Sequence, residues 1–155
     1  MTDAAEQHPV SRREIVSFRV ANQDFCIDIG SVREIRGWTP TTVLPHAPPY
    51  VTGVMNLRGA VLPVVDLSAR LGLGPTEPSP RHVIIIVMIE EMTAGLLVDA
   101  VSDILTVNGE EIKPTPDVAA GPAKTLVEGV LAIDERLIRL IDLGRVFPDH
   151  ERGEP

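Results

Sequence analysis

The sequence predicts an all-β protein built as two small barrels that arose from an internal duplication, with short helical turns between the strands. Two observations support this fold class. The stretch Gly53–Leu67 recurs without a gap as Gly129–Leu143. Short apolar runs of β type are separated by turn residues at hairpin spacing, and there is almost no long helix. Short strands at this spacing indicate barrels rather than a parallel βαβ sheet, and closing a barrel removes sheet edges that would otherwise aggregate.

The repeated stretch predicts a β-hairpin followed by a short helix. In the first copy two apolar runs, Val54–Leu57 and Ala60–Val65, flank the turn Arg58-Gly59, where glycine supplies a positive φ without steric cost. Asp66 is placed to cap a short helix, Leu67–Leu71, by accepting free backbone N–H groups.

The two copies differ in the residues of the turn. Asn56, Arg58 and Gly59 of the first copy become Ala132, Asp134 and Glu135 of the second. The scaffold therefore repeats while the turn chemistry does not, so we expect function to lie in that difference.

The rest of the chain supplies further short elements. Before the first repeated hairpin we expect a disordered leader at Met1–Arg13 and a hairpin of the strands Glu14–Val20 and Asp24–Ile29. A helical turn with a capping box at Ser31–Glu34 should follow, leading into a strand at Ile35–Trp38 and a rigid connector at Pro45–Pro49. After the first repeated hairpin we expect a loop without packed content at Gly72–Pro80, followed by two strands at His82–Ile89 and Thr93–Val98. Asp99–Ile104 should repeat the first helical turn, and Pro114–Lys124 should form a Pro-rich loop. The expected organisation is a leader at 1–13, one domain at 14–147 and a flexible tail at 148–155. Its subdomains span about 14–71 and 82–147, and interleaving of the two is left open.

Composition narrows the classes of partner. The chain has 155 residues, a net charge of −8 and a pI near 4.9, which argues against a nucleic-acid backbone or an anionic membrane surface as partner. Only 3% of the residues are aromatic, so a base-stacking or sugar-binding platform is disfavoured. The N-terminus lacks a secretion signal and the longest apolar run, Val83–Ile89, is too short to span a bilayer, so we expect a cytosolic protein without membrane insertion.

Candidate chemistry is sparse, and no cofactor or metal is expected. The four histidines lack ligand spacing, and the single Cys26 lies in a strand where burial is the simpler interpretation. The sequence contains none of the common nucleophile, phosphate-loop or dinucleotide motifs. Asp66 and Asp142 are equivalent in the repeat, and capping explains both better than a pair of catalytic acids. The sequence therefore favours a protein that is not an enzyme.

Arg58 is the strongest candidate for a functional side chain. A long cationic side chain at a hairpin tip has no role in a core. It either points into solvent, or it contacts a partner protein or forms an orienting ion pair, for which Glu34 is the most attractive residue. Val32, Val101 and Ile104 lie on the two expected helical turns, where they are either core residues or an exposed docking strip.

Three segments of the chain resemble the CheW family of chemotaxis coupling proteins. They read E-I-R-G at Glu34–Gly37, G-V-M-N-L-R-G-A-V-L-P-V-V-D-L at Gly53–Leu67 and V-D-A-V-S-D-I-L at Val98–Leu105. The resemblance runs from about Glu14 to Val146. The regulatory domain of the CheA histidine kinase and the CheV couplers share this CheW-like domain. The chain lacks phosphotransfer, ATP-binding and receiver segments, which favours a stand-alone coupler.

The resemblance implies two five-stranded SH3-like barrels and a non-catalytic adaptor. Relatives bridge the cytoplasmic tip of methyl-accepting chemotaxis receptors to CheA in receptor arrays, so a cytoplasmic protein recruited to membrane-associated arrays is expected. Positions associated with receptor or kinase binding in the family correspond to Val32, Glu34, Gly53, Arg58, Gly95, Val101 and Ile104. Ala100 stands where many relatives have glycine, and the short segment after Leu143 departs from relatives with a C-terminal helix.

We expect function by binding alone. The receptor tip would lie in a groove between the barrels, with Val32, Val101 and Ile104 as its floor and with Glu34 and Arg58 setting its register. The kinase would dock on a sheet edge or barrel flank of the first subdomain. A scaffold of a chemosensory pathway with an output other than motility is the main alternative, and a small-ligand-binding barrel is a remote one.

Overall fold

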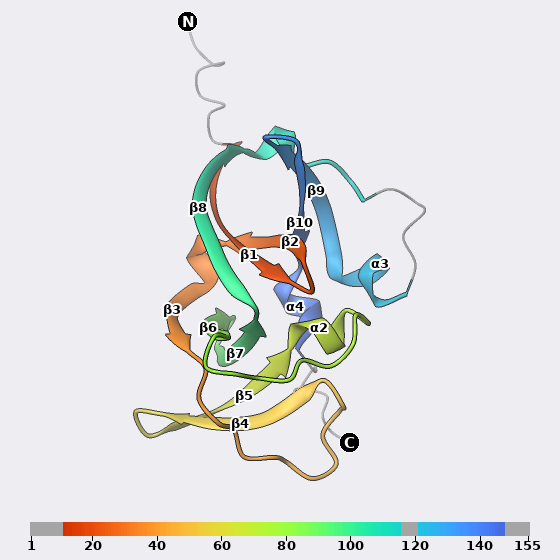
Figure 1. Ribbon diagram of the computed structural model, residues 1–155. Helices are drawn as coiled ribbons and strands as arrows, with labels where there is room; N and C mark the ends of the chain where they lie inside the picture. Colours follow the sequence, from red (N-terminus) through yellow and green to blue (C-terminus); the bar gives the residue numbers. More distant parts are fainter. Residues whose placement is uncertain (1–10, 116–120, 148–155) are drawn as a thin grey trace, which may run out of the picture.

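The computed structural model describes residues 11–115 and 121–147. Within these ranges ten strands form two five-stranded sheets, joined by short helices (Figure 1). This confirms the predicted all-β class. Most of the expected leader and all of the expected tail lie outside the described residues. Arg12 and Arg13, which were assigned to the leader, belong to the first strand and pair with Asn108 and Val107.

The elements follow one another along the chain in two similar series. The first series comprises β1 Arg12–Val20, β2 Gln23–Asp28, the 3-10 helix η2 Ile29–Ser31, β3 Val32–Gly37, β4 Val51–Leu57, β5 Ala60–Asp66 and α2 Leu67–Arg70. The second series comprises β6 Val83–Ile89, β7 Met92–Val98, β8 Ala100–Asn108, the 3-10 helix η3 Gly109–Glu111, α3 Pro122–Leu126, β9 Val127–Ile133, β10 Arg136–Ile141 and α4 Leu143–Val146.

Both repeated hairpins form as predicted. Arg58 and Gly59 turn β4 into β5 with φ angles of 52° and 91°, and Asp134 and Glu135 turn β9 into β10 with φ angles of 52° and 69°. Each hairpin ends in an aspartate that caps the following helix. The Asp66 side chain accepts from the backbone N–H groups of Ser68 and Ala69, and Asp142 accepts from that of Gly144.

The two halves of the chain exchange strands. One sheet has the order β8-β1-β2-β10-β9 and the other has the order β3-β6-β7-β5-β4. We call the first barrel A and the second barrel B. Barrel A takes β1 and β2 from the first half of the chain and β8, β9 and β10 from the second half. Barrel B takes β3, β4 and β5 from the first half and β6 and β7 from the second half. The expected contiguous subdomains, 14–71 and 82–147, are therefore not the units of the sheets, and the interleaved arrangement is the one observed.

Three hydrophobic clusters hold the barrels together. One fills the inside of barrel A, a second fills the inside of barrel B, and the largest lies between the barrels and draws on strands of both. Ile84 and Ile86 point into barrel B, whereas Ile85 and Val87 point into the cluster between the barrels. Because β6 is buried on both faces, its sequence is continuously apolar instead of alternating.

The two predicted helical turns are wrong. Ser31–Glu34 does not form a capping box: η2 ends at Ser31 without a side-chain cap, and Val32 begins β3. The predicted echo at Asp99–Ile104 lies mostly in β8. In both places the chain leaves one sheet and pairs with the other, and this pairing overrides the local signal. The capping box of the structure joins Asn108 and Glu111 at η3.

Two loops hold more structure than the sequence indicates. The loop Gly72–Pro80 was expected to have no packed content, but the backbone N–H and the hydroxyl of Thr76 both donate to the Asp66 carboxylate at 2.7 Å. The Ser68 hydroxyl donates to the Gly74 carbonyl at 2.7 Å. At the end of the expected loop Pro114–Lys124 the helix α3 begins.

Candidate functional site

The predicted pairing of Arg58 with Glu34 is present. The Arg58 guanidinium donates to the Glu34 carboxylate at 2.6 Å, and Arg36 donates to the other carboxylate oxygen at 2.9 Å. Glu34 and Arg36 lie on β3, at one edge of sheet B, and Arg58 lies at the tip of the β4–β5 hairpin at the other edge. The ion pair therefore spans the two edges of the sheet and helps to close barrel B.

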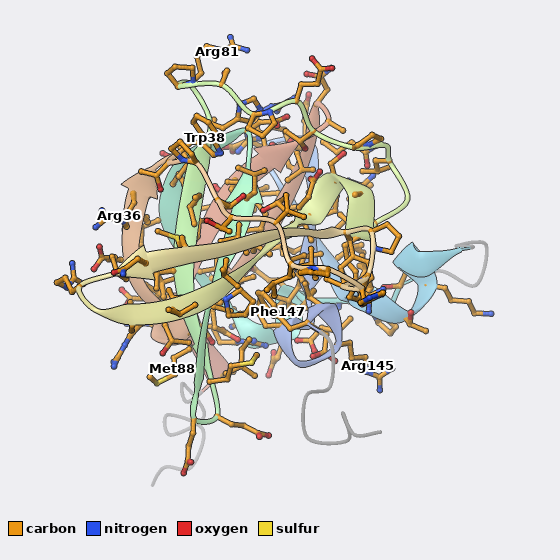
Figure 2. All side chains as sticks on the ribbon, turned by 90° about the horizontal axis from the view of Figure 1, so that it is seen from below. Arg36, Trp38, Arg81, Met88, Arg145 and Phe147 are labelled. Atoms are coloured by element: carbon orange, nitrogen blue, oxygen red, sulfur yellow. The ribbon has the colours of Figure 1, made fainter. Side chains whose placement is uncertain are left out.

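The electrostatics of this cluster favour the charged forms. Hydrogen bonds from Arg58 and then from Arg36 lower the pKa of Glu34 below its usual value, and the bond to Glu34 raises the pKa of Arg58. The Arg58 side chain is 68% exposed, so it presents charge to solvent while the carboxylate holds it in place. Figure 2 shows the labelled Arg36 near the outer end of the β4–β5 hairpin.

The conformation of the Arg58 turn is set by a neighbour that the sequence analysis passed over. The Asn56 side chain accepts from the backbone N–H of Gly59 at 3.0 Å, which stabilises a turn with two residues at positive φ. The second hairpin has Ala132 at this position and cannot make this bond. Arg36 was also missed, although its place two residues after Glu34 on a strand puts both side chains on one face.

The three apolar candidates lie on strands and differ in exposure. Val32 and Val101 are half-buried and pack against the cluster between the barrels, whereas Ile104 is 60% exposed. They occupy β3 and β8, which are edge strands of different sheets. Ile35, which aligns with Ile104 in the duplication, is 45% exposed and was not selected from the sequence. Only part of the expected docking strip is therefore open to a partner.

The two candidate glycines are buried. A Cβ atom on Gly53 would lie 2.3 Å from the Thr42 carbonyl oxygen, and the φ angle of Gly53 is +146°. A Cβ atom on Gly95 would lie 2.9 Å from a methyl group of Ile84 and 3.3 Å from one of Val64. Both positions thus serve the close approach of neighbouring segments in barrel B, and neither offers a side chain to a partner.

The described residues hold no group of three or more His, Cys, Asp or Glu side chains suited to a metal ion. Burial raises the pKa of the Cys26 thiol to about 12, which keeps it protonated and unreactive. The Nδ1 atom of His82 accepts from the Ser79 backbone N–H at 3.0 Å, so its lone pair is occupied. The Ser79 hydroxyl also lies 3.1 Å from Nδ1, and the Asp99 carboxylate lies 3.4 Å from Nε2, so these contacts order the turn before β6.

In the part of the chain that the structure covers, none of the helices has the length and apolar character needed to cross a bilayer. The described surface carries the ion pair between Arg58 and Glu34 and exposed aliphatic side chains such as Ile104 and Ile35.

Comparison with known proteins identifies the family. Residues 14–151 match the CheW-like domain. The chain is 57% identical over 152 residues to the chemotaxis protein CheW of Rhizobium meliloti (strain 1021), covering 98% of each chain. It is 32% identical over 134 residues to the chemotaxis protein CheW of Bacillus subtilis (strain 168), covering 86% of each.

A solved structure agrees with the fold. The scaffolding protein TtCheW from Thermoanaerobacter tengcongensis superposes with a TM-score of 0.80 at 36% identity, covering 87% of this chain and 92% of that one. The agreement extends to the two SH3-like barrels predicted above. The chain therefore belongs to the CheW-like domain family, as a chemotaxis scaffold protein and not an enzyme.

Proposed function

We propose that this chain is the adaptor that joins methyl-accepting chemotaxis receptors to the CheA histidine kinase, and that it is recruited from the cytoplasm to membrane-associated receptor arrays. The observation that carries the proposal is the Arg58–Glu34 pair. It presents an ordered cation that is 68% exposed on the scaffold of the family. A preformed charge of this kind binds a partner without a further loss of side-chain entropy.

We assign the receptor to the surface around this pair. Arg58 and Glu34 would set the register of a helical receptor hairpin by charge-assisted hydrogen bonds, and Ile104 would supply exposed apolar area. Val32 and Val101 would contribute their exposed halves. Gly53 and Gly95 would act indirectly, because each lets two segments of barrel B approach closely and so keeps the surface in shape.

Calorimetric titration with a receptor cytoplasmic fragment tests this assignment. Arg58→Ala and Ile104→Asp are expected to weaken binding at least tenfold, whereas Arg33→Ala, an exposed change on the same strand as Glu34, is expected to leave it unchanged. Binding to the CheA regulatory domain is measured in parallel. If the unmodified chain binds neither the receptor fragment nor the kinase domain, the adaptor function is wrong.

A further inference from the structure

His82 lies at the end of the loop that joins α2 to β6. The Trp38 backbone N–H donates to the His82 carbonyl at 3.0 Å, which extends the pairing of β3 with β6 by one residue. Figure 2 shows Trp38 and Arg81, the neighbour of His82, at the same end of the molecule. The His82 side chain is only 12% exposed, so its ring nitrogens interact mainly with other groups of the protein.

The two ring nitrogens of His82 contact different segments of the chain. In the loop, the backbone N–H of Ser79 donates to Nδ1 at 3.0 Å. Nε2 lies 3.4 Å from the carboxylate of Asp99, at the point where the chain crosses from β7 to β8. The other oxygen of Asp99 accepts from the backbone N–H of Ala21, in the turn between β1 and β2, at 2.9 Å. One imidazole therefore joins the loop to the crossing segment and, through Asp99, to barrel A.

These contacts require one particular neutral form of the imidazole. A backbone N–H can only donate, so the Nδ1 atom that accepts from Ser79 carries no proton. The neutral ring then holds its proton on Nε2, where it faces the Asp99 carboxylate as a donor. The contacts on the two sides of the ring therefore agree on the same tautomer.

The duplication places a permanent cation at the matching position of the first half. Ile35 aligns with Ile104, and the same offset aligns Arg13 with His82. Arg13 donates to Asp28 at 2.7 Å, close to the other crossing, where the chain passes from β2 to β3. Both crossings thus have a basic side chain beside an aspartate. Arginine stays charged in proteins, whereas histidine changes its charge between about pH 5 and 8.

We propose that the charge of His82 controls the loop: the neutral ring holds the loop backbone at Ser79, and protonation releases it while the contact with Asp99 is kept. A proton on Nδ1 takes the lone pair that accepts from the Ser79 N–H, so two N–H groups would point at each other and the backbone must turn away. The Ser79 hydroxyl, 3.1 Å from Nδ1, is then the acceptor for the new N–H. On the other side of the ring, the hydrogen bond to Asp99 gains the attraction of opposite charges.

Other charged side chains on the elements around the ring are paired elsewhere or exposed. Arg19 of β1 and Arg36 of β3 each donate to a carboxylate on their own sheet. Glu77 and Arg81 in the loop are exposed. Asp99 is therefore the charged group that faces the imidazole, and it favours the protonated ring whereas the Ser79 N–H favours the neutral one.

Nuclear magnetic resonance of the full chain tests the inference. At about pH 8 the His82 ring is expected to carry its proton on Nε2, and the Ser79 amide signal should shift with the same midpoint as the ring as the pH is lowered to about 5. The hydrogen-exchange protection factor of the Ser79 amide should fall about tenfold over this range, because one hydrogen bond of the loop is lost. That of the Ala21 amide, which bonds to Asp99, should stay the same.

Three variants assign the effect to His82. His82→Gln does not gain a proton, so the Ser79 amide should no longer respond to pH. Asp99→Asn removes the opposite charge, so the transition should move to lower pH. His46→Gln changes an exposed histidine in another loop and serves as the matched control, which should leave the transition unchanged.

Three results would overturn the inference: a proton on Nδ1 at about pH 8, a Ser79 amide that does not respond while the His82 ring titrates, or a response that persists in His82→Gln. If His82→Gln does not fold, the Ser79 and Ala21 amides of the unmodified chain decide, since a general loosening of the protein would lower both protection factors together. None of these measurements involves a receptor or a kinase, so their outcome is independent of the proposed function.

Discussion

The Arg58–Glu34 pair has a structural role and an exposed surface at the same time. It joins the two edges of sheet B, yet its exposure means that solvent screens it, so it contributes little to the stability of the fold. Loss of the pair should therefore alter the surface without unfolding the protein. This separation makes Arg58 a useful position for tests of function.

The pKa of Glu34 reports on this pair. Arg58→Ala is expected to raise the pKa of Glu34 towards its usual value of 4.5, although Arg36 still lowers it. Because folding lowers the pKa of Glu34, the stabilisation from the ion pair is fully present at pH values above the pKa that Glu34 has in the unfolded chain. This stabilisation is lost as the pH falls through the pKa that Glu34 has in the folded protein. Carbon-detected NMR titration of the Glu34 carboxyl measures this, with Arg33→Ala as the control. An unchanged pKa in Arg58→Ala would show that the two side chains do not interact in solution.

Gly53 is expected to act through packing. Gly53→Ala should lower the free energy of unfolding by more than about 1 kcal/mol, because the new methyl group meets the Thr42 carbonyl and alanine is strained at positive φ. Gly37→Ala is the matched control, since nothing lies within 4 Å of a Cβ atom there. Urea denaturation measures both variants. Equal stabilities would contradict the packing role and leave direct contact with a partner as the explanation for this position.

The candidate side chains show how far sequence reasoning reaches. The Arg58–Glu34 contact was one of the possibilities that the sequence left open, the other being an Arg58 side chain that points into solvent. Arg36 and Asn56 were missed, since their roles depend on which face of β3 meets the hairpin and on the φ angles of the turn. The close approaches at Gly53 and Gly95 involve segments distant along the chain, which no local pattern reveals.

Among the elements, the two repeated hairpins were predicted correctly because their turns and caps are local. The connections η2–β3 and β7–β8 were not, because their conformation depends on pairing with strands of the other half. The signal Ser31–Glu34 is that of a helix start, yet β3 pairs with β6 along most of its length. Tertiary pairing therefore decided the structure of both crossing segments.

The two hairpin caps are expected to differ in their contribution to stability. Asp66 is 4% exposed and accepts from two backbone N–H groups of α2 and from both donors of Thr76, whereas Asp142 accepts from Gly144. Asp142→Ala should lower the free energy of unfolding by about 1 kcal/mol. Asp66→Ala should lower it further, by about 2–3 kcal/mol, because it leaves buried donors unpaired. Chemical denaturation compares them, and equal losses would show that the loop contacts of Asp66 contribute nothing.

Arg70 links the two capped helices across the barrels. At the end of α2 its guanidinium donates to the carbonyls of Arg145 and Val146 at 2.7 Å each and lies 4.4 Å from the centre of the Tyr50 ring. Arg70→Ala should lower the free energy of unfolding by about 1–3 kcal/mol, since hydrogen bonds from a charged group and a cation–π contact are lost. Thermal and urea unfolding measure it against Arg81→Ala, an exposed change. A loss no larger than in the control would contradict the link.

The exchange of strands between the halves could not be predicted from the sequence. Hydrophobic periodicity identifies a strand and its buried face, but it does not say which strand it pairs with. The duplication suggested one barrel per half, because each half contains five strands. The large cluster between the barrels stabilises the exchanged arrangement, because it buries Phe18 and Phe25 of barrel A together with Ile85 and Leu96 of barrel B.

The exchange predicts that neither half folds alone. If the chain is divided between Glu77 and Pro78, in the loop that joins the halves, β3 loses its partner β6 and β8 loses its partner β1. Each fragment alone should lack a cooperative thermal transition, because each retains only hairpins whose apolar faces are uncovered.

An equimolar mixture should form a 1:1 complex with the circular dichroism spectrum of the intact chain and a cooperative transition that shifts with concentration. Ultracentrifugation establishes the stoichiometry, with each fragment alone as the control. A fragment that unfolds cooperatively as a monomer would show that one half can close a barrel by itself, and the reciprocal pairing would then not be the basis of the fold.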